Sequence, residues 1–183
     1  MTKLTTAVAL GAAFLALGAC DNQGGANGSA QTSEAKNAAG TKTVAAGLNA
    51  NGRFMGAAKA AGLDQTLAGP GPYTVIVADD AAFTALTPGT YDNWLKPENR
   101  AQLTGVMTNM ILPGTVLAED ISKAIDNGKG KAVLATMGGG TLTATKEGSK
   151  IVLASASGKK AVVTQADDKF TNGVVHHVDG VLM

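Results

Sequence analysis

The sequence has little of three residue classes that often decide how a protein is built. It contains one cysteine in 183 residues, so no disulfide can form within the chain and folding depends on the hydrophobic core. Aromatic residues make up only 4%, so this core must consist mainly of valine, leucine, isoleucine, alanine and methionine. Charges of both signs nearly balance, with a formal net charge of +1. The chain has no basic stripe, which argues against binding to nucleic acid or to anionic lipid by charge alone.

The chain also lacks the patterns of common catalytic centres. No serine lies in a nucleophile elbow, and no phosphate-binding glycine loop opens a helix. The glycines at 138–140 fall between two predicted strands and predict a hairpin turn. His176 and His177 are the only histidines, and neighbours on a strand point to opposite faces, so they cannot easily share a metal ion. We expect one of them to be buried or hydrogen-bonded and the other exposed. The sequence therefore predicts a protein without catalysis, cofactor or metal.

The single cysteine, Cys20, ends an N-terminal segment with the layout of a secretory signal. Lys3 is followed by an uncharged apolar run from Leu4 to Leu17, too short for the roughly 20 residues that span a bilayer. The cysteine makes the segment similar to a bacterial lipoprotein signal, which implies cleavage after Ala19 and acylation of Cys20. The alternative is an ordinary secreted protein with a buried thiol.

Residues 20–40 contain no large apolar side chain and no periodicity, which predicts a flexible tether. These segments together predict lipid anchoring on the periplasmic side of a bacterial cell envelope, or secretion. Asp21 follows the cysteine, and in enteric bacteria an aspartate there favours the inner membrane.

The remaining chain is long enough for one domain with a real core. Apolar spacing predicts helices first and strands later, an order that indicates an α+β fold. Predicted helices cover 51–62 with a stop at Gly62, 79–85, the vicinity of Trp94, 97–109 and 116–125. Predicted strands cover 73–77, 110–112, 132–136, 140–145, 151–154, 161–164 and 174–181, with hairpin turns at 137–140, 147–149 and 157–159.

Several segments in register resemble the fasciclin domain. Residues 73–86 (YTVIVADDAAFTAL) and 171–182 (TNGVVHHVDGVL) resemble its two signature stretches, and residues 111–114 (ILPG) resemble its central Pro-Gly element. Residues 60–72 resemble the approach to the first stretch. The positions that carry the resemblance are Asp79, Asp80, Phe83, Pro113, Gly114, Asn172, Gly173, His176 and Asp179.

The resemblance implies one fasciclin domain over residues 41–183, a compact β-sandwich or wedge with flanking short helices. It implies a non-enzymatic role in adhesion or binding, with a protein or a surface glycan as the partner. Animal members carry an Asp-Ile motif related to integrin binding, and here Asp168 replaces the isoleucine after Asp167. That site is therefore not expected in this chain, and Asp167-Asp168 is interpreted as a solvated turn.

Two features leave alternatives open. Asp79 and Asp80 suit either an acid/base pair or, as we expect, the cap of the helix that follows. Met55, Met107 and Met110, with Phe54 and Trp94, either fill the core, as we expect, or line an apolar groove. Some algal fasciclin-domain proteins bind carotenoids, so the resemblance keeps a second function open, the transport of a carotenoid or another small apolar lipid.

Overall fold

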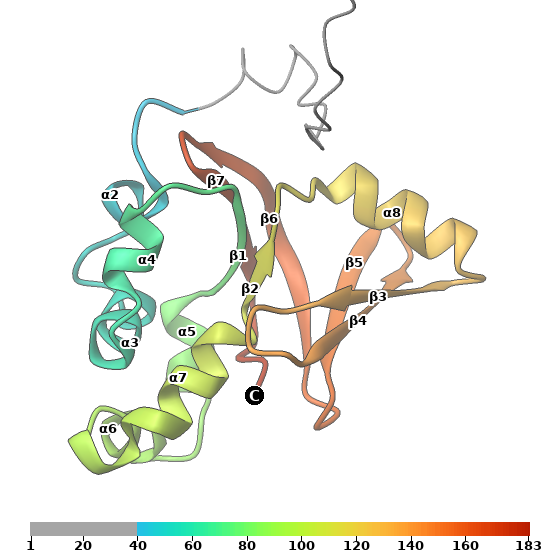
Figure 1. Cartoon of the computed structure of the whole chain (residues 1–183). Helices are drawn as coiled ribbons and strands as arrows, with labels where there is room; N and C mark the ends of the chain where they lie inside the picture. The colour runs from blue at the N-terminus through green and yellow to red at the C-terminus, as the bar shows by residue number, and fades with distance from the viewer. Residues whose placement is uncertain (1–39) are drawn as a thin grey trace, which may run out of the picture. The chain divides into compact units, whose positions relative to one another are not determined.

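The computed structural model of the protein describes residues 40–183 (Figure 1). The predicted signal sequence, Cys20 and the predicted tether up to residue 39 lie outside these described residues. Within residues 40–183, no helix is both long enough and apolar enough to cross a membrane.

The helices of the described residues, 40–183, are short, and all but one precede the second strand. They are α2 (Val44–Gly47), α3 (Arg53–Ala61), α4 (Asp64–Ala68), α5 (Asp80–Thr84), α6 (Thr90–Trp94), the 3-10 turn η1 (Pro97–Asn99), α7 (Arg100–Thr108) and α8 (Ala118–Asn127). Figure 1 shows α2 to α7 grouped beside the first two strands, whereas α8 lies apart from them. The α8 helix packs against the third and fourth strands instead.

The first long helix, α3, shows how the apolar spacing produces local structure. Phe54, Met55 and Ala58 fall on one face of the helix and are buried. Gly62 ends the helix in the left-handed region, with φ of 78°, where glycine has no Cβ to clash. The predicted helix and its stop are confirmed. The predicted helix at 97–109 is also present, although its first turn, which begins at Pro97, is the 3-10 turn η1.

The strands in the part of the chain that the structure describes form one sheet of seven in the order β2-β1-β7-β6-β5-β4-β3. They are β1 (Tyr73–Ala78), β2 (Ile111–Pro113), β3 (Lys131–Ala135), β4 (Thr141–Glu147), β5 (Lys150–Ser155), β6 (Lys160–Phe170) and β7 (Gly173–Val178). Only β1 and β7 run parallel; every other neighbouring pair is antiparallel. The predicted α+β class and the three predicted hairpins are confirmed.

The sixth strand differs most from the prediction. It extends to Phe170 rather than ending near residue 164, and its register with β7 shifts twice. Its first residues pair with β5 and the later ones with β7, so β6 links the two halves of the sheet. The interpretation of Asp167-Asp168 as a solvated turn was wrong: both lie in β6, and Asp167 has a φ of 61° beside a register shift.

The strands β1 and β7 bring together two segments about a hundred residues apart in the chain. Their parallel register places Ile76 opposite His176 and Val77 opposite His177. The pair is buried almost along its whole length, as expected for a parallel pair covered on both faces. Beyond Val178 the chain bends at Asp179-Gly180, so the last predicted strand ends earlier than residue 181.

The methionines and large aromatic residues of the helical half fill the core. Five side chains are at most 5% exposed: Phe54, Met55, Trp94, Met107 and Met110. They belong to the same buried cluster as the apolar side chains of the sheet. The interpretation of these residues as core is confirmed, because an open groove would leave them exposed.

The two ends of the sheet approach each other. The backbone N–H of Met137, after β3, donates to the carbonyl of Ile111 in β2 at 2.8 Å. The N–H of Gly138 donates to the carbonyl of Thr108 at 3.1 Å. These bonds fix the β3–β4 turn against the start of β2.

Candidate functional site

The two adjacent histidines of β7 occupy different environments. His176 is fully buried, whereas the side chain of His177 is 24% exposed. Because successive side chains alternate across a strand, one ring lies in a polar network inside the fold and the other reaches a hollow at the surface. The prediction of one buried and one exposed histidine holds, although His177 is only partly exposed.

The hydrogen bonds of His176 define its protonation state. Its Nε2 lies 2.9 Å from the carbonyl oxygen of Val116, which can only accept, so Nε2 carries the proton. Its Nδ1 accepts from the backbone N–H of Asp167 at 3.2 Å, so Nδ1 is unprotonated. Burial lowers the pKa of His176, while the bond to Val116 and the nearby Asp167 carboxylate oppose this shift. The ring is therefore a neutral structural link.

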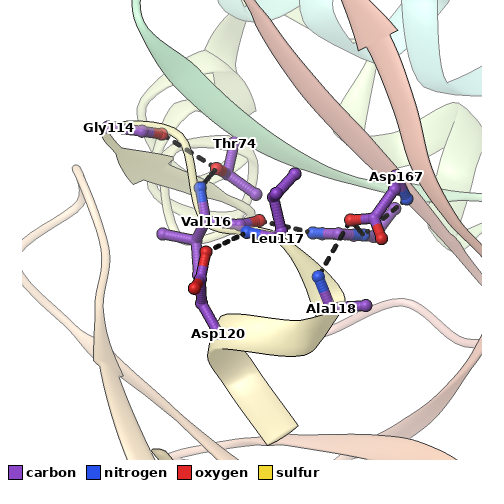
Figure 2. A network of polar contacts seen from close by, with 8 residues as sticks. Thr74, Gly114, Val116, Leu117, Ala118, Asp120 and Asp167 are labelled. Atoms are coloured by element: carbon purple, nitrogen blue, oxygen red, sulfur yellow. Dashed lines mark hydrogen bonds and ion pairs between the residues drawn. The ribbon is translucent and has the colours of Figure 1, made fainter. Parts of the chain in front are cut away.

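Thr74 supplies the second link of the same network (Figure 2). Its buried hydroxyl donates to the carbonyl of Gly114 and accepts from the N–H of Val116, both at 2.8 Å. Gly114 itself has a φ of 87° just after Pro113. The Pro-Gly element thus turns the chain sharply, and Thr74 on β1 holds the turned segment in place.

Asp167 fixes the start of α8. Its Oδ1 accepts from the N–H of Ala118 at 2.8 Å, and Asp120 accepts from the N–H of Leu117 at 3.1 Å (Figure 2). The bulge in β6 therefore places a carboxylate at the first turn of a helix, where free amides need acceptors. The Asp167 carboxylate serves the fold of this chain.

Asn172 ties the helical half to the sheet. Its Oδ1 accepts from the N–H of Val44 at 2.8 Å, and its Nδ2 donates to the carbonyls of Leu67 and Gly69 at 2.9 and 2.8 Å. All these contacts are made by one buried side chain. The next residue, Gly173, lies so close to the Tyr73 carbonyl that an added Cβ would collide with it.

Asp179 performs a similar task at the other end of β7. Its Oδ1 accepts from the N–H of Val162 at 2.7 Å, and its own N–H donates to the Val162 carbonyl at 3.1 Å. The pair closes the junction between β6 and the bend after β7.

The two acidic residues after β1 do not cap α5 with their side chains. Asp79 occupies the N-cap position, but its Oδ1 lies 3.2 Å from Nδ1 of His177. The Oδ1 of Asp80 accepts from the N–H of Arg53 at 2.8 Å, so Asp80 caps α3 instead. The prediction that this pair caps its own helix was wrong, because neighbouring elements offer better-placed donors. Phe83 is buried and meets the Tyr91 ring edge-on, at 5.5 Å between centroids.

A hollow of about 180 Å³ lies at the ends of β1 and β7. Its walls come from the α2–α3 loop, the first turn of α3, the end of β1, the start of α5 and β7. The lining residues include Leu48, Phe54, Met55, Val77, Asp79 and His177. Apolar side chains and carboxylates thus meet at one surface depression.

The Asp79–His177 pair supplies a carboxylate and an imidazole, as in a catalytic triad, but no nucleophile lies beside it among residues 40–183. Among residues 40–183, Nε2 of His177 has no hydroxyl or other side chain within hydrogen-bond distance. The described residues also hold no group of three His, Cys, Asp or Glu side chains placed to bind a metal. The arrangement offers hydrogen-bond acceptors and charge.

Sequence reasoning missed the Asp79–His177 pair and the role of Asp167. The signal for the first was available, since both residues end apolar strands that resemble family signatures, but the parallel register that joins them is a tertiary fact. The role of Asp167 depends on a bulge that no local pattern marks.

Comparison with known proteins assigns this arrangement to a family. A sequence model of the Fasciclin domain matches residues 51–183, most of the chain. The protein therefore belongs to the fasciclin-domain family, whose members are known as adhesion and binding modules and are generally non-enzymatic. The resemblance inferred from the signature stretches is confirmed.

Two similar proteins come from the cyanobacterium Synechocystis sp. (strain ATCC 27184 / PCC 6803 / Kazusa). Protein sll1483 is 32% identical over 140 residues, which cover 76% of this chain and 71% of that protein. Uncharacterized protein sll1735 is 30% identical over 130 residues, which cover 69% and 84% of the two chains.

A solved structure supports the fold. The domain pair of the insect cell adhesion molecule Fasciclin I matches with a TM-score of 0.55 and 22% identity over 71% of this chain. The matched region spans 44% of that longer chain. At this identity the match shows the fold alone, and it confirms the predicted fasciclin-type domain.

Proposed function

We propose that this protein is a non-enzymatic adhesion or binding module held at the bacterial cell envelope by an N-terminal lipid. The observation that carries the proposal is the fasciclin-domain match over residues 51–183. The polar side chains at the signature positions support it, because most of them hold strands and turns together rather than converge on a reacting atom. Such a scaffold presents a stable surface.

The proposed anchor rests on Cys20 and the segment before it. The layout of residues 1–20 is that of a lipoprotein signal, and residues 20–40 have the composition of a tether. A lipid-modified Cys20 would display the domain on the periplasmic side, with Asp21 favouring the inner membrane, whereas signal cleavage without acylation would release it. The partner we propose is a protein or a surface glycan.

The alternative, a carrier of a carotenoid or similar lipid, is less well supported. Ligand pockets for small molecules commonly enclose about 300–1,000 Å³ and bury most of the ligand. The hollow beside His177 measures about 180 Å³. The methionines that were candidates for an apolar groove are at most 4% exposed, and Met107 and Met110 do not border this hollow, although Met55 does.

The test compares the native full-length protein with Cys20→Ser in a bacterial host. We expect radiolabelled palmitate on the native protein only, and attachment of cells to a surface or partner to fall when the gene is deleted and to stay low with Cys20→Ser. Attachment that is unchanged by deletion would contradict the adhesion role. Absence of the label on native protein would contradict the anchor alone.

A second measurement separates binding from carriage. The protein purified from its own cells is extracted, and its absorption and lipid mass spectra are recorded. We expect no stoichiometric apolar ligand. A carotenoid or lipid recovered at one per chain would support the carrier instead.

A further inference from the structure

The hollow beside His177 is lined by the carboxylates of Asp79 and Asp80 and by the Asn49 carboxamide, which can donate as well as accept. His177 donates its Nδ1 proton to Oδ1 of Asp79 at 3.2 Å. Asp79 is otherwise approached only by the Thr164 hydroxyl, at 3.4 Å. Asp80 uses Oδ1 on the Arg53 amide, and its second oxygen has no hydrogen-bond partner among residues 40–183. A ligand that contacts these carboxylate oxygens must bring donors.

The cationic side chains of α3, Arg53 and Lys59, make contacts with other groups. The Arg53 guanidinium lies 5.1 Å from the centroid of the Tyr91 ring, and the Lys59 ammonium lies 3.4 Å from the Ala50 carbonyl. Within the described part of the chain, neither forms an ion pair with Asp79 or Asp80. The two carboxylates therefore line the hollow without a lysine or arginine paired to either of them among residues 40–183.

The floor of the hollow is apolar. Phe54, Met55 and Val77 contribute to it and are each at most 5% exposed. The hollow measures about 180 Å³, below the range usual for pockets that enclose a whole small molecule. An extended side chain with a methylene stem and a charged end matches both the floor and the acidic rim.

We propose that this hollow binds one lysine side chain of a partner protein, with the stem on the apolar floor and the ammonium at Asp79 and Asp80. This inference rests on the proposed binding function and names the chemistry of its partner. A neutral glycan fits less well, because its hydroxyls carry no positive charge to pair with the two carboxylates. An ammonium has three donors and no acceptor, which complements the hollow.

The test uses the ¹⁵N-labelled full chain carrying Cys20→Ser, titrated with N-acetyl-lysine methylamide. We expect saturable amide shifts at residues 48–55, 77–80 and 177, with an affinity that falls as salt is raised. The matched probe N-acetyl-norleucine methylamide has the stem without the charge and should bind at least threefold more weakly. Equal binding of the two probes would overturn the proposal, and so would tighter binding of glucose or N-acetylglucosamine.

Two variants test whether the lysine probe binds at this hollow. Asp79→Asn should weaken the lysine probe about 3- to 10-fold, the scale of one partly exposed charge pair. Glu147→Gln removes the same charge from the exposed end of β4 and should leave binding unchanged. Equal weakening by both would show a general charge effect and overturn the site.

A further variant places a lysine side chain in the hollow and leaves both carboxylates in place. Asn49 lies exposed on its rim, so Asn49→Lys places a competing ammonium beside the acids and should abolish probe binding. Asn127→Lys, at the exposed end of α8, is its control and should bind normally. If Asn49→Lys binds the probe like native protein, the proposal fails, even where full-length protein still captures a partner and the adhesion role stands.

Discussion

The backbone N–H of Asp167 donates a hydrogen bond to Nδ1 of His176 across the bulge between β6 and β7. The same aspartate accepts from Ala118 through its side chain, and the same ring donates to Val116. One histidine and one aspartate thus join β7, the bulged β6 and the segment leading into α8. The arrangement holds only while Nδ1 is unprotonated.

Stability should therefore fall as the solution becomes acidic. Burial lowers the pKa of His176 from its ordinary 6.5, so below that pH the unfolded chain binds a proton that the folded chain does not. The contribution is fully present above pH 6.5 and decreases as pH falls through the lowered pKa, by at most about 1.4 kcal/mol per pH unit for one proton. Urea unfolding between pH 5 and pH 8 measures it.

The control for this pH effect is His176→Gln, which keeps a donor for Val116 but does not titrate. We expect its unfolding free energy to vary less with pH than that of the native protein. The variant His177→Gln should keep the contribution of His176. A native pH dependence that survives unchanged in His176→Gln would contradict the assignment.

Replacement of Thr74 by valine should destabilise the fold. Valine has nearly the same shape, but it leaves the Gly114 carbonyl and the Val116 amide without their partner in a buried place. The expected loss is about 2 kcal/mol in the free energy of unfolding. Thr74→Ser retains the hydroxyl and should lose less, and the opposite order in urea unfolding would exclude the hydrogen bonds as the cause.

Asn172→Asp should be more damaging than its size suggests. A carboxylate in place of the amide removes both donors and faces the carbonyls of Leu67 and Gly69 at hydrogen-bond distance. We expect a loss of about 3 kcal/mol, measured by urea or thermal unfolding. The same amide-to-acid change at the exposed Gln102 of α7 is the control and should have little effect. Similar losses at both positions would contradict the role given to Asn172.

The adjacent residues Asp79 and Asp80 should differ in how much each stabilises the fold. Asp80→Ala removes the cap of α3 at the Arg53 amide and should cost about 1 kcal/mol of stability. Asp79→Ala removes a partly exposed contact to His177 and should cost less. Comparison of the two unfolding midpoints tests this order. A larger loss for Asp79 would show that it, and not Asp80, holds the helical half in place.

The sequence predicts much of the fold because its local signals agree with the tertiary structure. The hairpin turn at 147–149 follows the alternating strand β4, the turn at 157–159 follows the apolar strand β5, and Gly62 stops α3 where the apolar spacing ends. Five large side chains spread over the helical half were recognisable as core from composition. The length of β6 was not predictable, since two adjacent aspartates favour a turn, and the pairing of Asp168 with β7 and the contact of Asp167 with α8 are tertiary interactions.

The candidate site was predictable only in part. Signature residues such as Asn172 and His176 stood out, but their partners Val44 and Val116 contribute backbone groups that no sequence pattern marks. The Asp79–His177 contact joins residues 98 positions apart. It depends on the parallel pairing of β1 with β7, and a single sequence does not reveal which strands become neighbours.

The bonds from Met137 and Gly138 to the carbonyls of Ile111 and Thr108 affect how copies behave when crowded. The outermost strand of an open sheet is a template on which another polypeptide can polymerise. Here β2 is an edge strand, and the turn after β3 hydrogen-bonds to part of it, so that part is unavailable to another polypeptide. At high concentration, neighbouring copies therefore have less opportunity to aggregate by pairing edge to edge along this strand.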